Sequence, residues 1–206
     1  MLLKVTLILS SLSLLIMPLT ATEVNIQEGV PYVDVEVNGK SIRIERIQDT
    51  SNKLKNSYTK TSRPTPPFNI QPYEPIKGIE TIGELCVIDF LQDEVSSNKG
   101  MIIDARMPKW HKAGSIPHSL NIPFPILTIK NFNEKIAQIF GVKKKKDSWD
   151  FDNAKTLLIY DNGPWCQQGV HAMKNLVKIG YPKSKILYYR GGMQYWQILG
   201  LTTIIK

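Results

Sequence analysis

Cys166 is the residue of this chain whose type and position most directly suggest chemistry. It lies in the segment YDNGPWCQQGVHAM at 160–173, between the apolar run TLLIY at 156–160 and an amphipathic stretch. The run predicts a strand, and the stretch predicts a helix that begins near His171 or Ala172. In a parallel α/β sheet, ligands bind beyond the carboxyl ends of the strands. The cysteine is expected at such a strand end, which makes it a candidate nucleophile.

The backbone around Cys166 is expected to favour the thiolate. The chain turns into the helix over four residues: Gln167, Gln168, Gly169 and Val170. Successive N–H groups in such a turn form an anion-binding concavity, and the helix N-terminus adds positive potential. Both features predict a depressed thiol pKa and a nucleophilic sulfur. His171 would add positive charge when protonated, although a histidine at a helix start is often only solvated.

A structural role for Cys166, or a disulfide with Cys86, is the alternative interpretation. A structural free cysteine is usually buried inside an element, whereas Cys166 follows Pro164 and Trp165 on a loop. Cys86 lies in the apolar helical stretch ELCVIDFL and is interpreted as a core residue. The loop CQQGVH has no Arg or Lys, and Ala172 stands where a tyrosine-phosphatase-type loop has its phosphate-clamping Arg. The loop therefore disfavours phosphate and suits a persulfide.

The composition is that of a globular protein. Of its 206 residues, 42% are hydrophobic and 21% are charged, which excludes global disorder. The net charge is +8, but no nucleic-acid motif is present and aromatic residues do not alternate with the basic ones, so no nucleic-acid partner is expected. The four lysines at 143–146 are interpreted as a solvated surface loop. Two cysteines and three histidines without ligand spacing predict no metal site.

Residues 1–21 have the layout of a secretory signal peptide. Lys4 precedes an apolar run from Val5 to Leu19, and small residues follow at 20–22. The run is short for a membrane span. Leu19 stands where a small residue would be preferred if Ala21 were the last residue of the signal. An uncleaved signal anchor in the membrane is therefore an alternative. The rest of the chain should be exported, and we expect it in a bacterial periplasm. Binding to another periplasmic protein is an open alternative.

Residues 22–75 predict a β-hairpin and a proline-rich strap. In YVDVEVNGKSIRIERI, apolar and polar residues alternate on both sides of Asn38-Gly39, which is a strong hairpin signal. A lone hairpin is marginally stable, so it should pack on another part of the chain. The prolines between 64 and 75 favour extended backbone, as in a linker or a strap across the domain surface.

Residues 76–206 predict an α/β domain with a parallel sheet flanked by helices on both faces, because strands and helices alternate. The expected strands are 76–80, 101–104, 121–124, 156–160 and 185–189. Thr81 and Glu84 fit a capping box that opens a helix through Leu91. Further helices are expected over 133–140, from the cysteine loop to Gly180, and over 193–199.

Four motifs of residues 76–206 resemble those of a rhodanese-like (sulfurtransferase) domain, in the family's order. MIIDAR resembles the strand that ends in Asp-x-Arg, and WHKAGSIPHSLNIPF is similar to the Gly-His-Ile-Pro-Gly-Ala-x-Asn-Ile-Pro segment. LLIYDNGPWCQQGVHAMKNLVKIGYP resembles the active-site strand, loop and helix, and YYRGGMQYWQILGL the Gly-Gly-x-x-x-Trp ending. The common form of the family has its cysteine directly after the strand, where Asp161 stands here. This chain resembles the longer variant with NGPWC, whose cysteine comes five residues later.

The resemblance implies a sulfurtransferase that needs no cofactor. Cys166 would carry a persulfide, taking sulfur from a small donor such as thiosulfate and passing it to a thiol or another nucleophilic acceptor. Residues 167–171 would form its cradle, and Asp104 and Arg106 would be a buried pair that braces the loop. Two alternatives stay open: a catalytically weak or inactive rhodanese-like module for protein binding in the periplasm, and a thiol redox protein that uses Cys86 and Cys166.

Overall fold

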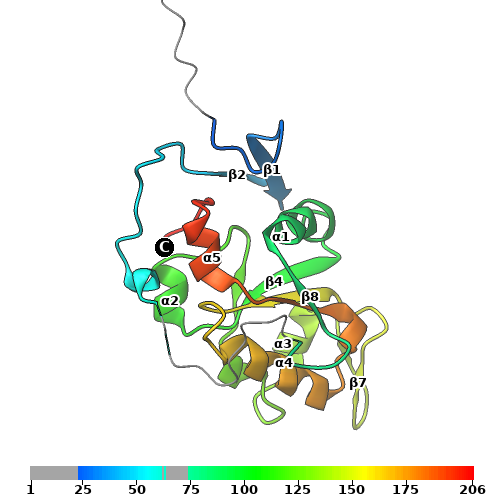
Figure 1. The fold of residues 1–206 in the computed structure, drawn as a ribbon. Helices are drawn as coiled ribbons and strands as arrows, with labels where there is room; N and C mark the ends of the chain where they lie inside the picture. The colour runs from blue at the N-terminus through cyan, green and yellow to red at the C-terminus, as the bar shows by residue number, and fades with distance from the viewer. Residues whose placement is uncertain (1–22, 62, 64–73) are drawn as a thin grey trace, which may run out of the picture.

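A five-stranded sheet forms the centre of the structure, a computed structural model that describes residues 23–61, 63 and 74–206 (Figure 1). The strand order is β3-β9-β8-β4-β5, and every neighbouring pair is parallel. The strands are β3 (Glu80–Ile82), β4 (Gly100–Asp104), β5 (Leu120–Asn121), β8 (Thr156–Tyr160) and β9 (Ile186–Tyr189). The predicted α/β fold with a parallel sheet is confirmed.

Helices cover both faces of this sheet. They are α1 (Glu84–Phe90), α2 (Pro108–Lys112), α3 (Glu134–Ile139), α4 (Gln168–Ile179) and α5 (Gly192–Ile198). The structure also has short 3₁₀ helices, η1 (Ser57–Thr59), η3 (Phe124–Leu127) and η4 (Lys183–Lys185), and a π-helical segment, η2 (Leu91–Val95), that follows α1 directly. Successive side chains of β8 point to opposite faces. Leu157 and Ile159 therefore pack in one core with α3 and α4, and Leu158 and Tyr160 in another with α1 and α5. The expected helices on both faces are confirmed.

The predicted hairpin is present as β1 (Tyr32–Val37) and β2 (Lys40–Glu45), which pair in antiparallel register. Asn38 and Gly39 have positive φ values of 51° and 74°, which a tight two-residue hairpin turn requires. Val35 and Ile44 are buried in the same core as the helices α1 and α5, and Figure 1 shows the hairpin next to α1. The hairpin therefore packs on the domain, as expected for a unit that is marginal alone.

The boundaries of three elements differ from the predictions. β3 begins at Glu80 rather than at 76, and Thr81 lies in this strand opposite Tyr188. The N-cap of α1 is Gly83, which has no side chain to bond, so the predicted capping box is wrong. β5 ends at Asn121, because Pro123 has no N–H for a strand ladder and leads into η3.

The four-lysine segment also has more structure than predicted. Lys143–Lys144 forms the short strand β6, which pairs antiparallel with β7 (Trp149–Asp150). Both lysines of β6 are exposed, so the segment is solvated as expected, but it is one arm of a short hairpin instead of an irregular loop.

The predicted signal segment at 1–21 and residues 64–73 of the proline-rich strap lie outside the described residues. Within the part of the chain that the structure describes, no helix combines the length and apolar character needed to cross a membrane.

Candidate functional site

Cys166 lies in the loop that leaves the carboxyl end of β8 and enters α4. Its backbone N–H donates to the Gly163 carbonyl at 2.8 Å, which closes a tight turn. α4 begins at Gln168, with Gln167 as its N-cap residue, so the helix starts earlier than the expected His171 or Ala172. The cysteine therefore stands immediately before a helix N-terminus and is only 7% exposed.

Backbone and side-chain N–H groups converge on the sulfur of Cys166. The N–H groups of Gln168 and Asn162 donate to it from the backbone, and both interactions lower the thiol pKa. The Asn162 side chain adds a third donor, with Nδ2 at 3.6 Å from Sγ. A sulfur that carries negative charge would be stabilised by these donors.

Asp161 occupies part of the predicted anion cradle with its own carboxylate. Oδ2 accepts the Gly169 N–H at 2.7 Å, and Oδ1 accepts the Gly163 N–H at 3.2 Å. The carboxyl group is fully buried, and the Cys166 side chain hydrogen-bonds to it. Burial raises the pKa of Asp161 to about 6, against the lowering effect of the two backbone N–H groups. A largely ionised acceptor therefore lies beside the thiol at neutral pH.

The thiol pKa of Cys166 is raised to about 11, so the expected depression is wrong. Burial is the largest cause, and the negative charge of Asp161 is the second. The donors of Gln168 and Asn162 lower the pKa but do not outweigh these two effects. Cys166 is therefore a protonated thiol at neutral pH and needs a base to become a nucleophile.

Gln168 and Gly169 contribute to the site mainly through their backbone N–H groups, which donate to the Cys166 sulfur and to Asp161 respectively. The Gln168 side chain also accepts from Asn162 Nδ2 at 3.5 Å, and Gln167 is half-buried. Val170 packs in the core with α3, whereas His171 is exposed on α4 with its ring centroid 5.9 Å from that of Phe124. These last two side chains of the predicted cradle thus have other neighbours.

Asp104 and Arg106 form the buried ion pair that the resemblance implied. Arg106 donates from Nε to Oδ1 at 2.8 Å and from Nη2 to Oδ2 at 2.6 Å. Burial would lower the pKa of Arg106, but its hydrogen bonds and charge interaction with Asp104 raise it above the ordinary value. Burial would raise the pKa of Asp104, but hydrogen bonds from His111 and Arg106 hold it below the ordinary value. Both groups are therefore charged.

Helix α5 holds the cysteine loop from the opposite side. The N–H groups of Met193 and Gln194 donate to the carbonyls of Asp161 and Asn162 at 3.1 and 3.0 Å. Gly192 makes this approach possible, since a Cβ at that position would lie 2.5 Å from the Asp161 carbonyl oxygen. The Gly-Gly of the last motif therefore serves to bring α5 against the loop.

Three residues of the site were not predicted from the sequence. Asp161 was noted only as a departure from the common form, although an acid directly after a buried strand is a usable signal. Asn162 follows it in the same loop. Tyr58 comes from the N-terminal extension, defined here as residues 23–61 and 63, and its hydroxyl donates to Asn162 Oδ1 at 3.0 Å. Nothing in the sequence around Tyr58 indicates this contact.

Cys86 is exposed, which overturns its interpretation as a core residue. Val87, Ile88 and Leu91 form the buried face of this helical stretch, and Cys86 lies on the opposite face with Leu85. Cys86 and Cys166 are both free thiols in this structure.

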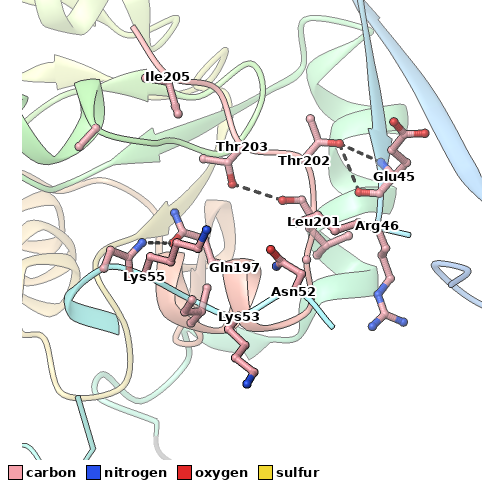
Figure 2. A pocket seen from close by; sticks show the side chains of 15 residues that line it. Glu45, Arg46, Asn52, Lys53, Lys55, Gln197, Leu201, Thr202, Thr203 and Ile205 are labelled. Atoms are coloured by element: carbon pink, nitrogen blue, oxygen red, sulfur yellow. Dashed lines mark hydrogen bonds between the residues drawn. The ribbon is translucent and has the colours of Figure 1, made fainter. Parts of the chain in front are cut away.

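A cavity of about 310 Å³ adjoins the cysteine loop at the carboxyl ends of β3 and β9. Its lining includes Pro164 of the loop and Glu84, Tyr189, Arg190 and Tyr195. A second cavity, a groove of about 510 Å³, lies between the N-terminal extension and the C-terminal segment, defined here as residues 200–206 (Figure 2). No residue of the cysteine loop lines this groove. The first cavity is therefore the better placed for a reactant of Cys166.

The described residues contain no group of three His, Cys, Asp or Glu side chains arranged to hold a metal ion.

The chain is similar to several solved structures of low sequence identity. The chain is similar to a human single-domain sulfurtransferase, TSTD1, with 20% identity over 57% of this chain and 95% of that chain and a TM-score of 0.41. It is also similar to a rhodanese with anions from E. coli, with 20% identity over 52% of this chain and 99% of that chain and a TM-score of 0.35. A rhodanese-related protein from Thermoplasma volcanium has 20% identity over 62% of this chain and 99% of that chain, with a TM-score of 0.41.

No curated protein sequence matches the chain. A family model described as Rhodanese-like domain matches residues 88–199, which is more than half of the 206 residues. The chain therefore belongs to the rhodanese-like domain family.

Proposed function

We propose that this protein is a sulfurtransferase that carries a persulfide on Cys166. The observation that supports this most directly is the position of the sulfur, at a strand end before α4 with three N–H donors directed at it. Such preorganised donors stabilise charge that develops on sulfur. The donor would be a small sulfane sulfur compound such as thiosulfate, and the acceptor a thiol or another nucleophile.

Asp161 supplies the base that the protonated thiol needs. In the first half-reaction the Cys166 proton passes to the Asp161 carboxylate as sulfur attacks the outer sulfur of the donor. The sulfur–sulfur bond of thiosulfate breaks, and sulfite leaves with the bonding electrons. In the second, an acceptor thiolate attacks the outer sulfur of the persulfide. The Cys166 sulfur then leaves and recovers its proton from Asp161.

Cyanolysis after loading with thiosulfate tests this function. The purified protein is expected to produce thiocyanate and to gain the mass of one sulfur atom on the peptide that contains Cys166. Cys166→Ser should abolish both signals, whereas the matched variant Cys86→Ser should retain them because Cys86 is exposed on α1. The proposal fails if neither signal appears with thiosulfate or with polysulfide as the donor.

An inactive protein-binding module is the second candidate, and the thiol environment favours it. A cysteine that is only 7% exposed and whose thiol pKa is raised to about 11 is a poor nucleophile at neutral pH. The redox alternative has less support, because Cys86 is exposed on α1 while Cys166 is buried in the loop. Absence of cyanolysis, together with a stable complex with an exported protein of the same cell, would select the binding module.

Export to the periplasm is proposed on the pattern of residues 1–21 alone. Mass measurement of the protein recovered from the producing cell tests it. A mature chain that begins near residue 22 supports cleavage, a full-length chain in the membrane fraction supports the anchor, and a full-length chain in the cytosolic fraction contradicts export.

A further inference from the structure

A continuous chain of hydrogen bonds connects the buried ion pair to the sulfur of Cys166. Arg106 Nη1 donates to the Tyr58 hydroxyl at 3.1 Å, and this hydroxyl donates to Asn162 Oδ1 at 3.0 Å. Asn162 Nδ2 then lies 3.6 Å from Cys166 Sγ. Arg106, Tyr58, Asn162 and Cys166 are each at most 7% exposed, so little water competes with these bonds.

The chemistry of the side chains gives this chain one direction. A guanidinium has only donors, so the Tyr58 oxygen must accept from Arg106 and its proton is free for another partner. That proton goes to Asn162 Oδ1, which leaves Nδ2 as the group of the amide that faces the sulfur. Every bond therefore polarises the next in the same sense, with the positive charge of Arg106 at one end and the sulfur at the other.

The N-terminal extension supplies Tyr58, and α5 holds it in place. Asn56 caps η1 by accepting the Tyr58 N–H at 3.0 Å, and its Nδ2 donates to Gln197 Oε1 at 2.7 Å. Gln194 Nε2 donates to the Tyr58 carbonyl at 3.0 Å. Figure 2 shows Gln197 in the groove between the extension and the C-terminal segment. These contacts fix the backbone of Tyr58 against α5, and the backbone in turn determines where the hydroxyl lies.

We propose that Tyr58 is a positioning residue of the sulfur site, through which the Arg106 charge and the Asn162 amide stabilise negative charge on Cys166. The loop itself has no Arg or Lys. Through Tyr58 and Asn162, the buried charge of Arg106 acts on the sulfur without contacting it. Asp161 acts in the opposite direction, because its carboxylate disfavours a second negative charge nearby. The inference rests on the proposed function for its purpose, but its test needs no sulfur transfer.

The test compares Tyr58→Phe with Tyr181→Phe in the full chain. Both tyrosines are buried, and Tyr181 donates instead to the Lys155 carbonyl, so it is a matched control for the loss of one buried hydroxyl. The rate of Cys166 alkylation by iodoacetamide is followed from neutral to alkaline pH by peptide mass spectrometry. Tyr58→Phe should slow alkylation at neutral pH by about three- to tenfold and move the rate profile to higher pH. Tyr181→Phe should leave both unchanged.

A double-mutant cycle separates the relay from a general effect on packing. Asn162→Ala removes the side-chain amide that joins Tyr58 to the sulfur but keeps the backbone donors, so Tyr58→Phe should have no further effect on the alkylation profile in that background. Effects that simply multiply would overturn the proposal, as would a Tyr58→Phe protein that alkylates like the wild type.

A third measurement avoids any loss of the hydroxyl. Replacement of Tyr58 by 3-fluorotyrosine makes the phenol a stronger donor with little change of shape. It should speed alkylation at neutral pH, and an unchanged rate would contradict the relay. If the Tyr58 variants change the alkylation of Cys166 as expected but the protein produces no thiocyanate, the proposed function fails and this inference stands.

Discussion

Asp161 couples the protonation of the loop to the stability of the fold. Its carboxyl pKa is about 6 in the folded chain, because burial opposes ionisation, and roughly 4 in an unfolded chain. The folded state therefore binds this proton more tightly. The resulting stabilisation is present below about pH 4 and is lost as the pH rises through about 6, which amounts to roughly 2–3 kcal/mol.

Urea unfolding of the wild type and of Asp161→Asn between pH 4 and pH 7 would measure this loss. The free energy of unfolding of the wild type should fall relative to that of the variant as the pH rises. Asp104 acts oppositely, because its folded pKa is lowered and its contribution is lost at low pH, but it is common to both proteins. A constant difference between the two proteins over this range would show that Asp161 ionises normally.

The two cysteines should differ in reactivity at neutral pH. Cys86 is exposed, whereas Cys166 is 7% exposed and its pKa is raised to about 11. Iodoacetamide should therefore label Cys86 first, and labelling of Cys166 should accelerate steadily into the alkaline range. Peptide mass spectrometry after short exposures checks the order. If Cys166 is labelled faster than Cys86 at neutral pH, the N–H donors of the loop stabilise the thiolate more strongly than burial destabilises it.

At the scale of elements, the contact between α5 and the cysteine loop depends on Gly192. Its φ of 54° is unfavourable for other residues, and an added Cβ would meet the Asp161 carbonyl oxygen at 2.5 Å. Gly192→Ala should lower the free energy of unfolding by at least about 2 kcal/mol and disturb the loop.

Gly83→Ala is the matched control, because nothing lies within 4 Å of the added Cβ and its φ is negative. Gly83 is the N-cap residue of α1, where Ala is less favourable than Gly, so this variant should cost about 1 kcal/mol or less and should leave the cysteine loop undisturbed. Equal thermal shifts for the two variants would show that α5 does not approach the loop as closely as described.

At the scale of the molecule, the N-terminal extension and the domain share one core. Val35, Ile44 and Tyr58 are buried in the cluster that also contains Met193 and Trp196. A segment that contributes core residues should unfold together with the rest. The extension is therefore expected to be part of the same cooperative unit.

Ile44→Ala tests this expectation. Ile44 is fully buried, so its truncation should cost about 2–5 kcal/mol in a single unfolding transition. Ile47→Ala, at a side chain that is 47% exposed, is the control and should cost about 1 kcal/mol or less. A separate early transition in calorimetry of Ile44→Ala would show that the extension unfolds independently.

Features that depend on neighbours in the chain were predictable. The alternation around Asn38-Gly39 placed the hairpin, and the change from an apolar run to an amphipathic stretch placed Cys166 between β8 and α4. The resemblance to the family's Asp-x-Arg motif implied that Asp104 and Arg106 form a pair, and the two side chains do bond directly.

Features that depend on competition for space and hydrogen bonds were decided by the tertiary structure. The sequence indicated donors around Cys166, but only packing determines that Asp161 takes the Gly169 and Gly163 N–H groups and that burial keeps the thiol protonated. Tyr58 reaches Asn162 across 104 positions of chain. Local sequence patterns carry no information on such a contact, because it forms only when the hairpin, η1 and α5 pack together.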